Sequence, residues 1–124
     1  MEKIKTFRDL KIWQKAVKFV TQIYQKTRDF PKEEIYSLTS QIRRSAILIP
    51  SNIAEGYGRN STNDYIRFLQ ISQSSLYENQ TQLEISYNLG YFQRSEFSEI
   101  YELSREIERM LSSLIKKVKQ SESK

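Results

Sequence analysis

A proline inside a helical pattern constrains the fold more than any other feature of this sequence. Apolar residues recur at steps of three and four from Leu38 to Ile53, which is the spacing of one face of an α-helix. Pro50 lies within this pattern, where a proline removes a backbone hydrogen bond and costs about 3 kcal/mol. A helix that keeps its pattern through a proline is expected to be kinked there. Gly56 and Gly58 are expected to end it.

The rest of the chain is also helical in its periodicity. No segment alternates with the period of two that is typical of a strand. Four helices of similar length are predicted, and their ranges are 8–28, 37–57, 62–89 and 96–119. Helices joined by short loops favour an all-α fold, an antiparallel up-down-up-down four-helix bundle. We expect residues 1–124 to form this single domain.

The composition excludes several kinds of chemistry. The chain has no cysteine and no histidine, so it lacks thiolate nucleophiles, the usual general base near neutral pH and the commonest metal ligand. We therefore expect no enzyme, no catalytic residue, no metal and no cofactor. No apolar run is long enough to span a membrane and no signal peptide is evident. The sequence is that expected of a soluble, cytoplasmic protein.

Positive charge is concentrated at the start of the chain. The net charge is +5, and residues 1–32 carry nine basic against three acidic residues. The first predicted helix has an apolar core stripe, which consists of Trp13, Ala16, Val17, Val20, Ile23, Tyr24 and Thr27. Lysines fall opposite this stripe, and they are Lys11, Lys15, Lys18 and Lys26. The lysine row is either an ordinary solvated face or a surface that faces phosphates.

The second and third predicted helices carry more apolar residues than one core stripe needs. The additional residues are Ile47, Leu48, Phe68, Ile71 and Ile85. Scattered exposed apolar side chains are ordinary in soluble proteins. Apolar residues gathered on one flank of two neighbouring helices indicate a subunit interface instead. We favour a homo-oligomer.

Polar residues fall on the same flank and have three interpretations: a ligand or catalytic pocket, a structural network, or plain exposure to solvent. These residues are Arg44, Asn52, Glu55, Glu78 and Gln82. Paired carboxylates such as Glu55 and Glu78 would fit a ligand or catalytic pocket. A partly buried network of arginine, carboxylate and amides would instead fix the register between helices or subunits. We favour the structural network, because no substrate follows from the residues.

Several motifs resemble a known family. The segments 7–16, 38–46, 49–59 and 68–83 follow its order and spacing, and the run Asn52-Ile-Ala-Glu-Gly56 after Pro50 is specific to it. Over about residues 7–115 the chain resembles the 23S rRNA-intervening sequence proteins. The resemblance implies a bacterial, cytoplasmic four-helix bundle that assembles into a ring, typically a pentamer. The chain is also similar to the accessory protein of diversity-generating retroelements, a basic pentameric barrel that binds nucleic acid and a reverse transcriptase.

The chain departs from the family pattern in three places. Ser74 stands where a glycine is common, Asn79 where an apolar residue is common and Asp64 where glutamate is usual. Ser74 and Asn79 bear on how the third helix packs and how a ring closes. They affect the expected size of the oligomer before they affect the fold.

These observations lead to a functional hypothesis of a non-enzymatic, oligomeric nucleic-acid-binding protein for structured RNA. The residues expected to contact phosphates are Lys11, Lys15, Lys18, Arg43, Arg44, Arg59 and Arg67. The alternative is a protein-interaction scaffold that recruits a nucleic-acid enzyme without contacting RNA itself. The expected partners are further copies of the chain, RNA or DNA, and such an enzyme, with no membrane.

Overall fold

The protein contains four long helices. The computed structural model describes residues 3–122, without the side chain of Glu122, and has no strand in that range. The α-helices are α1 (Lys11–Lys26), α2 (Leu38–Tyr57), α3 (Thr62–Asn88) and α4 (Arg94–Glu122), and short 3-10 helices are η1 (Phe7–Asp9) and η2 (Lys32–Glu34). The predicted all-helical class and four-helix bundle are confirmed. None of the helices in the described range is long and apolar enough to cross a membrane.

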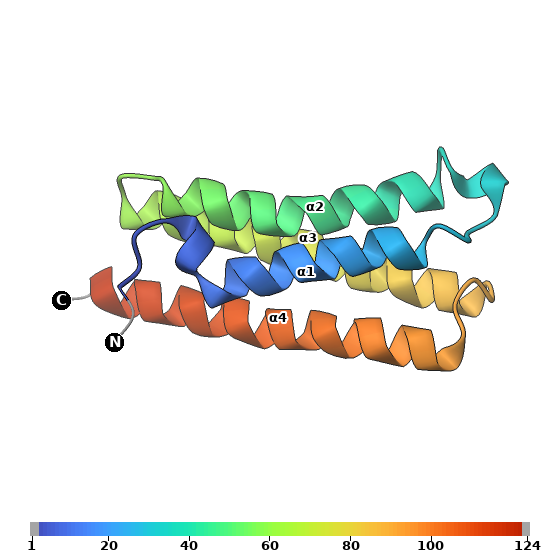
Figure 1. Ribbon diagram of the computed structural model, residues 1–124. Helices are drawn as coiled ribbons and strands as arrows, with labels where there is room; N and C mark the ends of the chain where they lie inside the picture. The colour runs from blue at the N-terminus through green and yellow to red at the C-terminus, as the bar shows by residue number, and fades with distance from the viewer. Residues whose placement is uncertain (1–2, 123–124) are drawn as a thin grey trace.

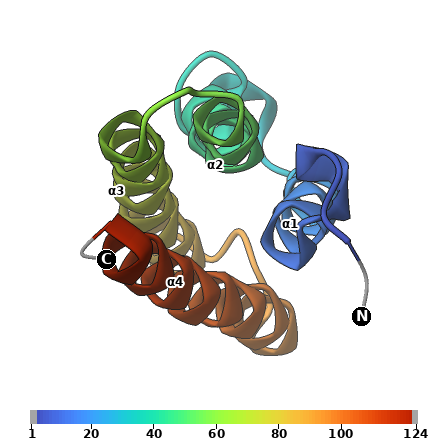
Figure 2. The same cartoon turned by 90° about the vertical axis from the view of Figure 1, so that its left-hand side faces the viewer.

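The helices surround one core, with α1 beside α2 and α4, and α3 beside α2 and α4 (Figure 2). At one end of the bundle lie the start of α1, the α2–α3 loop and the end of α4 (left in Figure 1). At the other end lie the α1–α2 and α3–α4 connections. Residues that are distant in sequence therefore meet at each end.

The first helix begins later than the sequence predicts. Instead of one continuous helix over 8–28, the chain forms η1 at Phe7–Asp9, is extended at Leu10 and begins α1 at Lys11. The Thr6 side chain accepts a hydrogen bond from the Arg8 N–H, and Thr6 and Asp9 form a capping box at the start of η1. These local bonds favour a separate turn over a continuous helix.

The core side of α1 also differs from the predicted stripe. The fully or almost fully buried residues are Ile12, Ala16, Phe19 and Ile23. Val17, which was expected in the core, is 37% exposed. The apolar face of α1 is broad because α1 packs against two helices, and the predicted stripe follows only its α2 side. The exposed residues on the α2 side of α1, such as Val17, line a surface groove described below.

The closest packing in the bundle is between α2 and α3. A Cβ atom on Gly56 would lie 2.8 Å from the Phe68 Cβ, so only glycine fits there without displacement. Buried serines line the same seam, and the Ser72 hydroxyl donates to the Ile49 carbonyl oxygen at 2.6 Å. Small residues let the two helices approach, and the Ser72 hydroxyl satisfies a carbonyl oxygen of the facing backbone. α2 itself continues through Pro50, which is buried. The kink at Pro50 stays a prediction.

Candidate nucleic-acid interface

Charge is divided unevenly between the two ends of the bundle. We call residues 3–18, 50–74 and 107–122 the basic end, and residues 19–49 and 75–106 the acidic end. The basic end has twelve basic and five acidic residues, a net charge of +7. The acidic end has seven basic and nine acidic residues, a net charge of −2. The fold therefore collects positive charge from three separate segments of the chain at one end.

The cations of the basic end are mostly exposed and unpaired. They are Lys3, Lys5, Arg8, Lys11, Lys15, Lys18, Arg59, Arg67, Arg109, Lys116, Lys117 and Lys119. All are exposed except Lys15, which is half-buried. Among the described residues only Lys15 and Arg67 of this set form ion pairs. Cations without internal partners remain available to an external anion.

The predicted lysine row of α1 faces α4 in part. Lys15 Nζ donates to Glu106 Oε1, and Lys26 Nζ lies 4.0 Å from Glu99 Oε2. The hydrogen bond from Lys15 lowers the pKa of Glu106, and the nearby charges of Lys15, Arg109 and Lys18 lower it further. α4 thus neutralises part of the row. The exposed members, Lys11 and Lys18, remain the better candidates for phosphate contact.

The structure places Arg43 and Arg44 at the acidic end, apart from the other five predicted phosphate contacts. Arg43 Nε donates to Thr27 Oγ1 at 2.9 Å, and its guanidinium carbon lies 4.6 Å from the centre of the Tyr24 ring. A second Arg43 nitrogen donates to the Tyr24 carbonyl oxygen at 3.4 Å. Arg43 therefore fastens the end of α1 to α2. Arg44 is exposed on the opposite side of α2.

Arginines and aromatic rings meet where α2 turns into α3. We call Tyr57, Arg59, Tyr65, Arg67 and Phe68 the α2–α3 corner. The guanidinium carbons of Arg59 and Arg67 lie 4.6 Å and 5.7 Å from the centre of the Phe68 ring. The Tyr57 and Tyr65 rings meet edge-on with their centres 6.2 Å apart. Burial raises the pKa of the Tyr65 hydroxyl, and the proximity of Tyr57 raises it further.

Sequence reasoning did not find this corner. It placed Phe68 at a subunit interface and took Arg59 and Arg67 as separate phosphate contacts. The signal in the sequence is the group of aromatic residues on both sides of the 58–61 loop, which becomes informative only when α2 and α3 are known to be adjacent.

The predicted polar network of α2 and α3 forms only in part. Arg44, Glu78 and Gln82 line one groove of about 460 Å³ with Leu48, but no ion pair joins Arg44 to Glu78 among the described residues. The other two members lie outside this groove. Asn52 Nδ2 donates to the Leu48 carbonyl oxygen of its own helix at 2.8 Å, and Glu55 is exposed.

The buried polar centre of the α2–α3 seam includes two residues that sequence reasoning did not assign to it, Ser45 and Asn79. Ser45 Oγ donates to Gln82 Oε1 at 2.7 Å. Asn79 Nδ2 donates to the Ile42 carbonyl oxygen and to Ser45 Oγ, both at 2.9 Å. Asn79 thus supplies a hydrogen bond from α3 to the backbone of α2. These bonds make the seam a structural contact between helices.

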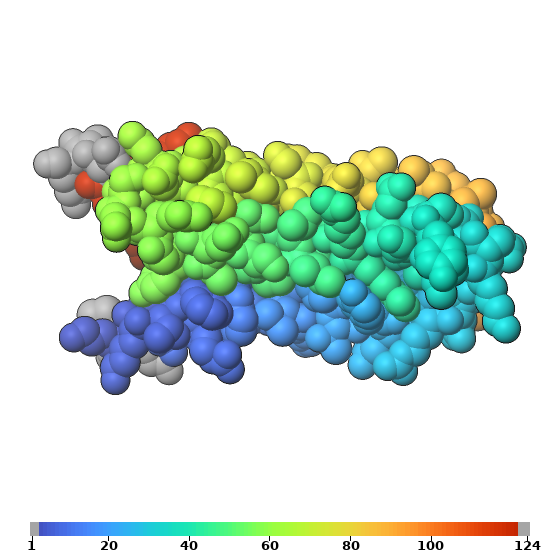
Figure 3. All heavy atoms as spheres, turned by 90° about the horizontal axis from the view of Figure 1, so that it is seen from above, coloured from blue at the N-terminus to red at the C-terminus, as the bar shows by residue number. Residues whose placement is uncertain are grey.

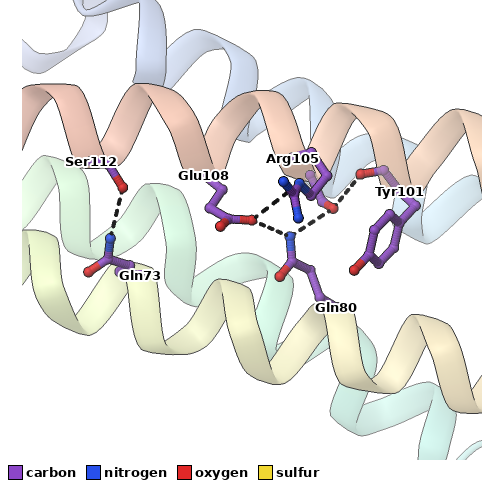
Figure 4. Close-up of polar contacts among 7 residues, drawn as sticks. Gln73, Gln80, Tyr101, Arg105, Glu108 and Ser112 are labelled. Carbon is purple, nitrogen blue, oxygen red and sulfur yellow. Dashed lines mark hydrogen bonds and ion pairs between the residues drawn. The ribbon is translucent and has the colours of Figure 1, made fainter.

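Polar side chains also bridge α3 and α4 (Figure 4). Gln73 Nε2 donates to Ser112 Oγ at 3.3 Å, and Gln80 Nε2 donates to Ser104 Oγ and Glu108 Oε1, both at 3.2 Å. Beyond Gln73, toward the basic end, a groove of about 510 Å³ is lined by Lys116 and Lys119 of α4. The two lysines give this groove the positive charge that suits a phosphate backbone.

An apolar groove of about 370 Å³ separates α1 from α2, which lie side by side on the face shown in Figure 3. Its apolar lining is Trp13, Val17, Val20, Ile47, Pro50 and Ala54. Ile47 is 40% exposed here. Leu48 lies in the Arg44 groove on the other side of α2, so the two residues belong to different surfaces. The apolar residues predicted to share one flank are therefore distributed over more than one surface.

Other ionisable side chains fasten loops. Hydrogen bonds from the Ser37 and Tyr91 hydroxyls lower the pKa of Glu34, which joins the start of α2 to the loop before α4. Backbone N–H groups of Lys5 and Thr6 lower the pKa of Asp9 in the same way. Within residues 3–122 no group of three or more His, Cys, Asp or Glu side chains could hold a metal ion.

Comparison with known proteins agrees with the motif resemblance. Residues 8–113 match the family model described as 23S rRNA-intervening sequence protein. A similar crystal structure is that of a protein of unknown function from the S23 ribosomal protein family of Bacteroides thetaiotaomicron. It is 28% identical, covers 85% of this chain and 95% of its own, and has a TM-score of 0.79. No curated protein matches the chain.

Proposed function

This chain belongs to the 23S rRNA-intervening sequence protein family, and we propose that it is a non-enzymatic protein that binds structured RNA through phosphate contacts as a homo-oligomer. The observation that carries the proposal is the basic end, where three segments of the chain bring together twelve basic and only five acidic residues. The electrostatic field of such an excess of positive charge attracts a polyanion regardless of its nucleotide sequence. In this proposal each protomer is an antiparallel up-down-up-down bundle, and the compartment is the bacterial cytoplasm.

The unpaired cations of the basic end supply the phosphate contacts. Lys11 and Lys18 extend from α1, and Lys116, Lys117 and Lys119 extend from the last turns of α4. Lysine has a flexible stem and a point charge, so these side chains can follow a curved phosphate backbone. Recognition through charge and shape is typical of proteins that bind double-stranded RNA.

Self-association would place several basic ends on one particle. The apolar groove between α1 and α2, in which Val17 and Ile47 are exposed, provides a surface that a second copy would cover. A ring, with the pentamer favoured, converts several weak sites into a strong one through their effective concentration. The proposal therefore predicts that RNA affinity and oligomeric state change together.

The test is a filter-binding titration of a structured RNA at two salt concentrations. About four phosphate contacts per site predict a loss of affinity of about a hundredfold between 50 and 200 mM salt. Affinity that does not change with salt would contradict the phosphate contacts. No binding at low salt would contradict the function.

The α1–α2 groove also supports a second candidate function, a scaffold that recruits a nucleic-acid enzyme. In that case the apolar groove holds the partner protein and the chain itself need not touch RNA. Affinity capture from a bacterial lysate, with and without nuclease treatment, separates the two functions. Partners that persist after nuclease treatment favour the scaffold, and partners that are lost favour RNA binding.

A further inference from the structure

We propose that the α2–α3 corner binds an unpaired base of the RNA, which stacks on the guanidinium plane of Arg59. The inference rests on the proposed function, because it names the part of an RNA that this corner recognises. The other cations of the basic end contact phosphates, which occur in every nucleic acid. The α2–α3 corner adds a preference for RNA with accessible bases.

Arg59 lies against an aromatic ring. Its guanidinium carbon lies 4.6 Å from the centre of the Phe68 ring, within the range of a cation–π contact. The ring covers one side of the cation and limits its rotation. Arg59 is exposed, and it forms no ion pair among the described residues. The cation is therefore accessible to a planar ligand from solvent.

The support of Arg59 is rigid. α2 ends at Tyr57 with Gly58 as its C-cap, and the Arg59 N–H donates to the Gly56 carbonyl oxygen at 3.1 Å. Gly56 allows α3 to approach so closely that an added Cβ would lie 2.8 Å from the Phe68 Cβ. Arg59 and Phe68 are thus held by adjacent parts of one tightly packed seam. A cation that is ordered before binding loses less conformational entropy when the ligand arrives.

The neighbouring cation, Arg67, is paired with a carboxylate. Arg67 also lies near Phe68, at 5.7 Å, but one of its nitrogens is 3.4 Å from Asp64 Oδ1. Asp64 therefore neutralises Arg67 in part, whereas Arg59 keeps its full charge. The corner presents one ordered, uncompensated guanidinium beside exposed lysines.

The chemistry of Arg59 selects the kind of ligand. Guanidinium planes and aromatic rings stack on nucleobases, and each stacked base contributes about five- to a hundredfold in affinity. Bases in a continuous duplex are already stacked on one another and cannot reach the corner. An unpaired base in a loop, bulge or single-stranded end can. The corner therefore favours RNA in which paired segments carry such a base.

The experiment compares two RNAs with equal numbers of phosphates, a continuous duplex and a hairpin whose loop carries 2-aminopurine. The full chain and its Arg59→Lys variant are titrated into each RNA at low salt, with anisotropy and 2-aminopurine fluorescence as readouts. Arg59→Lys keeps the charge and removes the plane. Arg28→Lys is the matched control, because Arg28 is exposed at the acidic end.

We expect Arg59→Lys to weaken hairpin binding about tenfold, to change duplex binding less than about twofold and to abolish the quenching of 2-aminopurine. Phe68→Leu should do the same if it remains folded by circular dichroism, while Arg28→Lys should behave like the wild type. Hairpin affinity and quenching that survive Arg59→Lys overturn the inference and leave charge-led binding intact. If the wild type binds neither RNA, both this inference and the proposed function are wrong.

Discussion

The two ends of the bundle use their charged residues differently. At the acidic end, Arg43 bonds to Thr27 and the Tyr24 carbonyl oxygen, and Glu34 accepts from Ser37 and Tyr91. These groups hold connections in place. At the basic end, most cations are exposed and form no ion pair with any residue that the structure describes. The comparison teaches that a charged residue is a candidate for binding only after its bonds within the fold are known.

The largest expected effect concerns the end of α4. Replacing Lys116, Lys117 and Lys119 together by glutamate should weaken RNA binding by about a hundredfold at low salt, because three phosphate contacts are lost and become repulsive. Filter binding measures the change. The triple substitution should leave the helical circular dichroism spectrum intact, since all three side chains are exposed.

The control for that variant reverses three exposed cations at the acidic end, Arg28, Lys32 and Arg94, in one chain. It has the same change in net charge, so it separates position from total charge. We expect less than a threefold change in affinity. Equal losses in the two triple variants would show that the ends do not differ in function.

The basic end also depends on close helix packing. Gly56→Ala should destabilise the protein by about 1–3 kcal/mol, because its Cβ would overlap the Phe68 Cβ and approach Tyr65. Gly58→Ala is the control. Its Cβ would meet nothing closer than 3.7 Å, and a change between zero and about 1 kcal/mol of stabilisation is expected there. Urea unfolding followed by circular dichroism measures both, and equal effects would contradict the close contact of α2 and α3.

At the acidic end, neighbouring arginines should differ in stability. Arg43→Ala should lose about 1–2 kcal/mol, because two hydrogen bonds and a cation–π contact join it to α1. Arg44→Ala should change the free energy of unfolding by less than about 0.5 kcal/mol, since Arg44 is exposed. Urea unfolding gives both values. RNA affinity should stay within about twofold of wild type for Arg43→Ala. A larger loss would show that Arg43 contacts RNA after all.

The smallest expected effect is a change in pH dependence. The Ser37 and Tyr91 hydroxyls lower the pKa of Glu34 from its ordinary 4.5. A group whose pKa is lowered by folding contributes stability above its unfolded pKa and loses it as the pH falls through the folded value. Tyr91→Phe removes one donor, so its deficit in melting temperature should be present at pH 6 and should shrink toward pH 3. A deficit that is constant with pH would show that Glu34 is not the relevant partner.

Local pattern predicted the helices but not the contacts between them. The spacing from Leu38 to Ile53 follows one helical face and needs no knowledge of neighbours, so α2 was predicted within one residue. The roles of Arg43 and Arg59 depend on residues elsewhere in the chain, Thr27 and Phe68. Periodicity carries no information about such pairs.

The same limit explains the apolar residues of α2 that lie outside the core. Ile47 and Leu48 are both off the predicted core stripe and looked like one patch. In the bundle they face different grooves, one against α1 and one against α3. The basic end likewise comes from three segments, and only the positions of the loops bring their charges together.

The difference between the two ends is tested most directly by lysine reactivity. The rate at which each lysine of the native protein reacts with an acylating reagent is measured by mass spectrometry, with and without structured RNA at low salt. The account predicts that RNA slows the reaction of Lys11, Lys116, Lys117 and Lys119 several-fold and leaves Lys32 unchanged. Protection of Lys32 to the same degree, or no protection at the basic end, would contradict it.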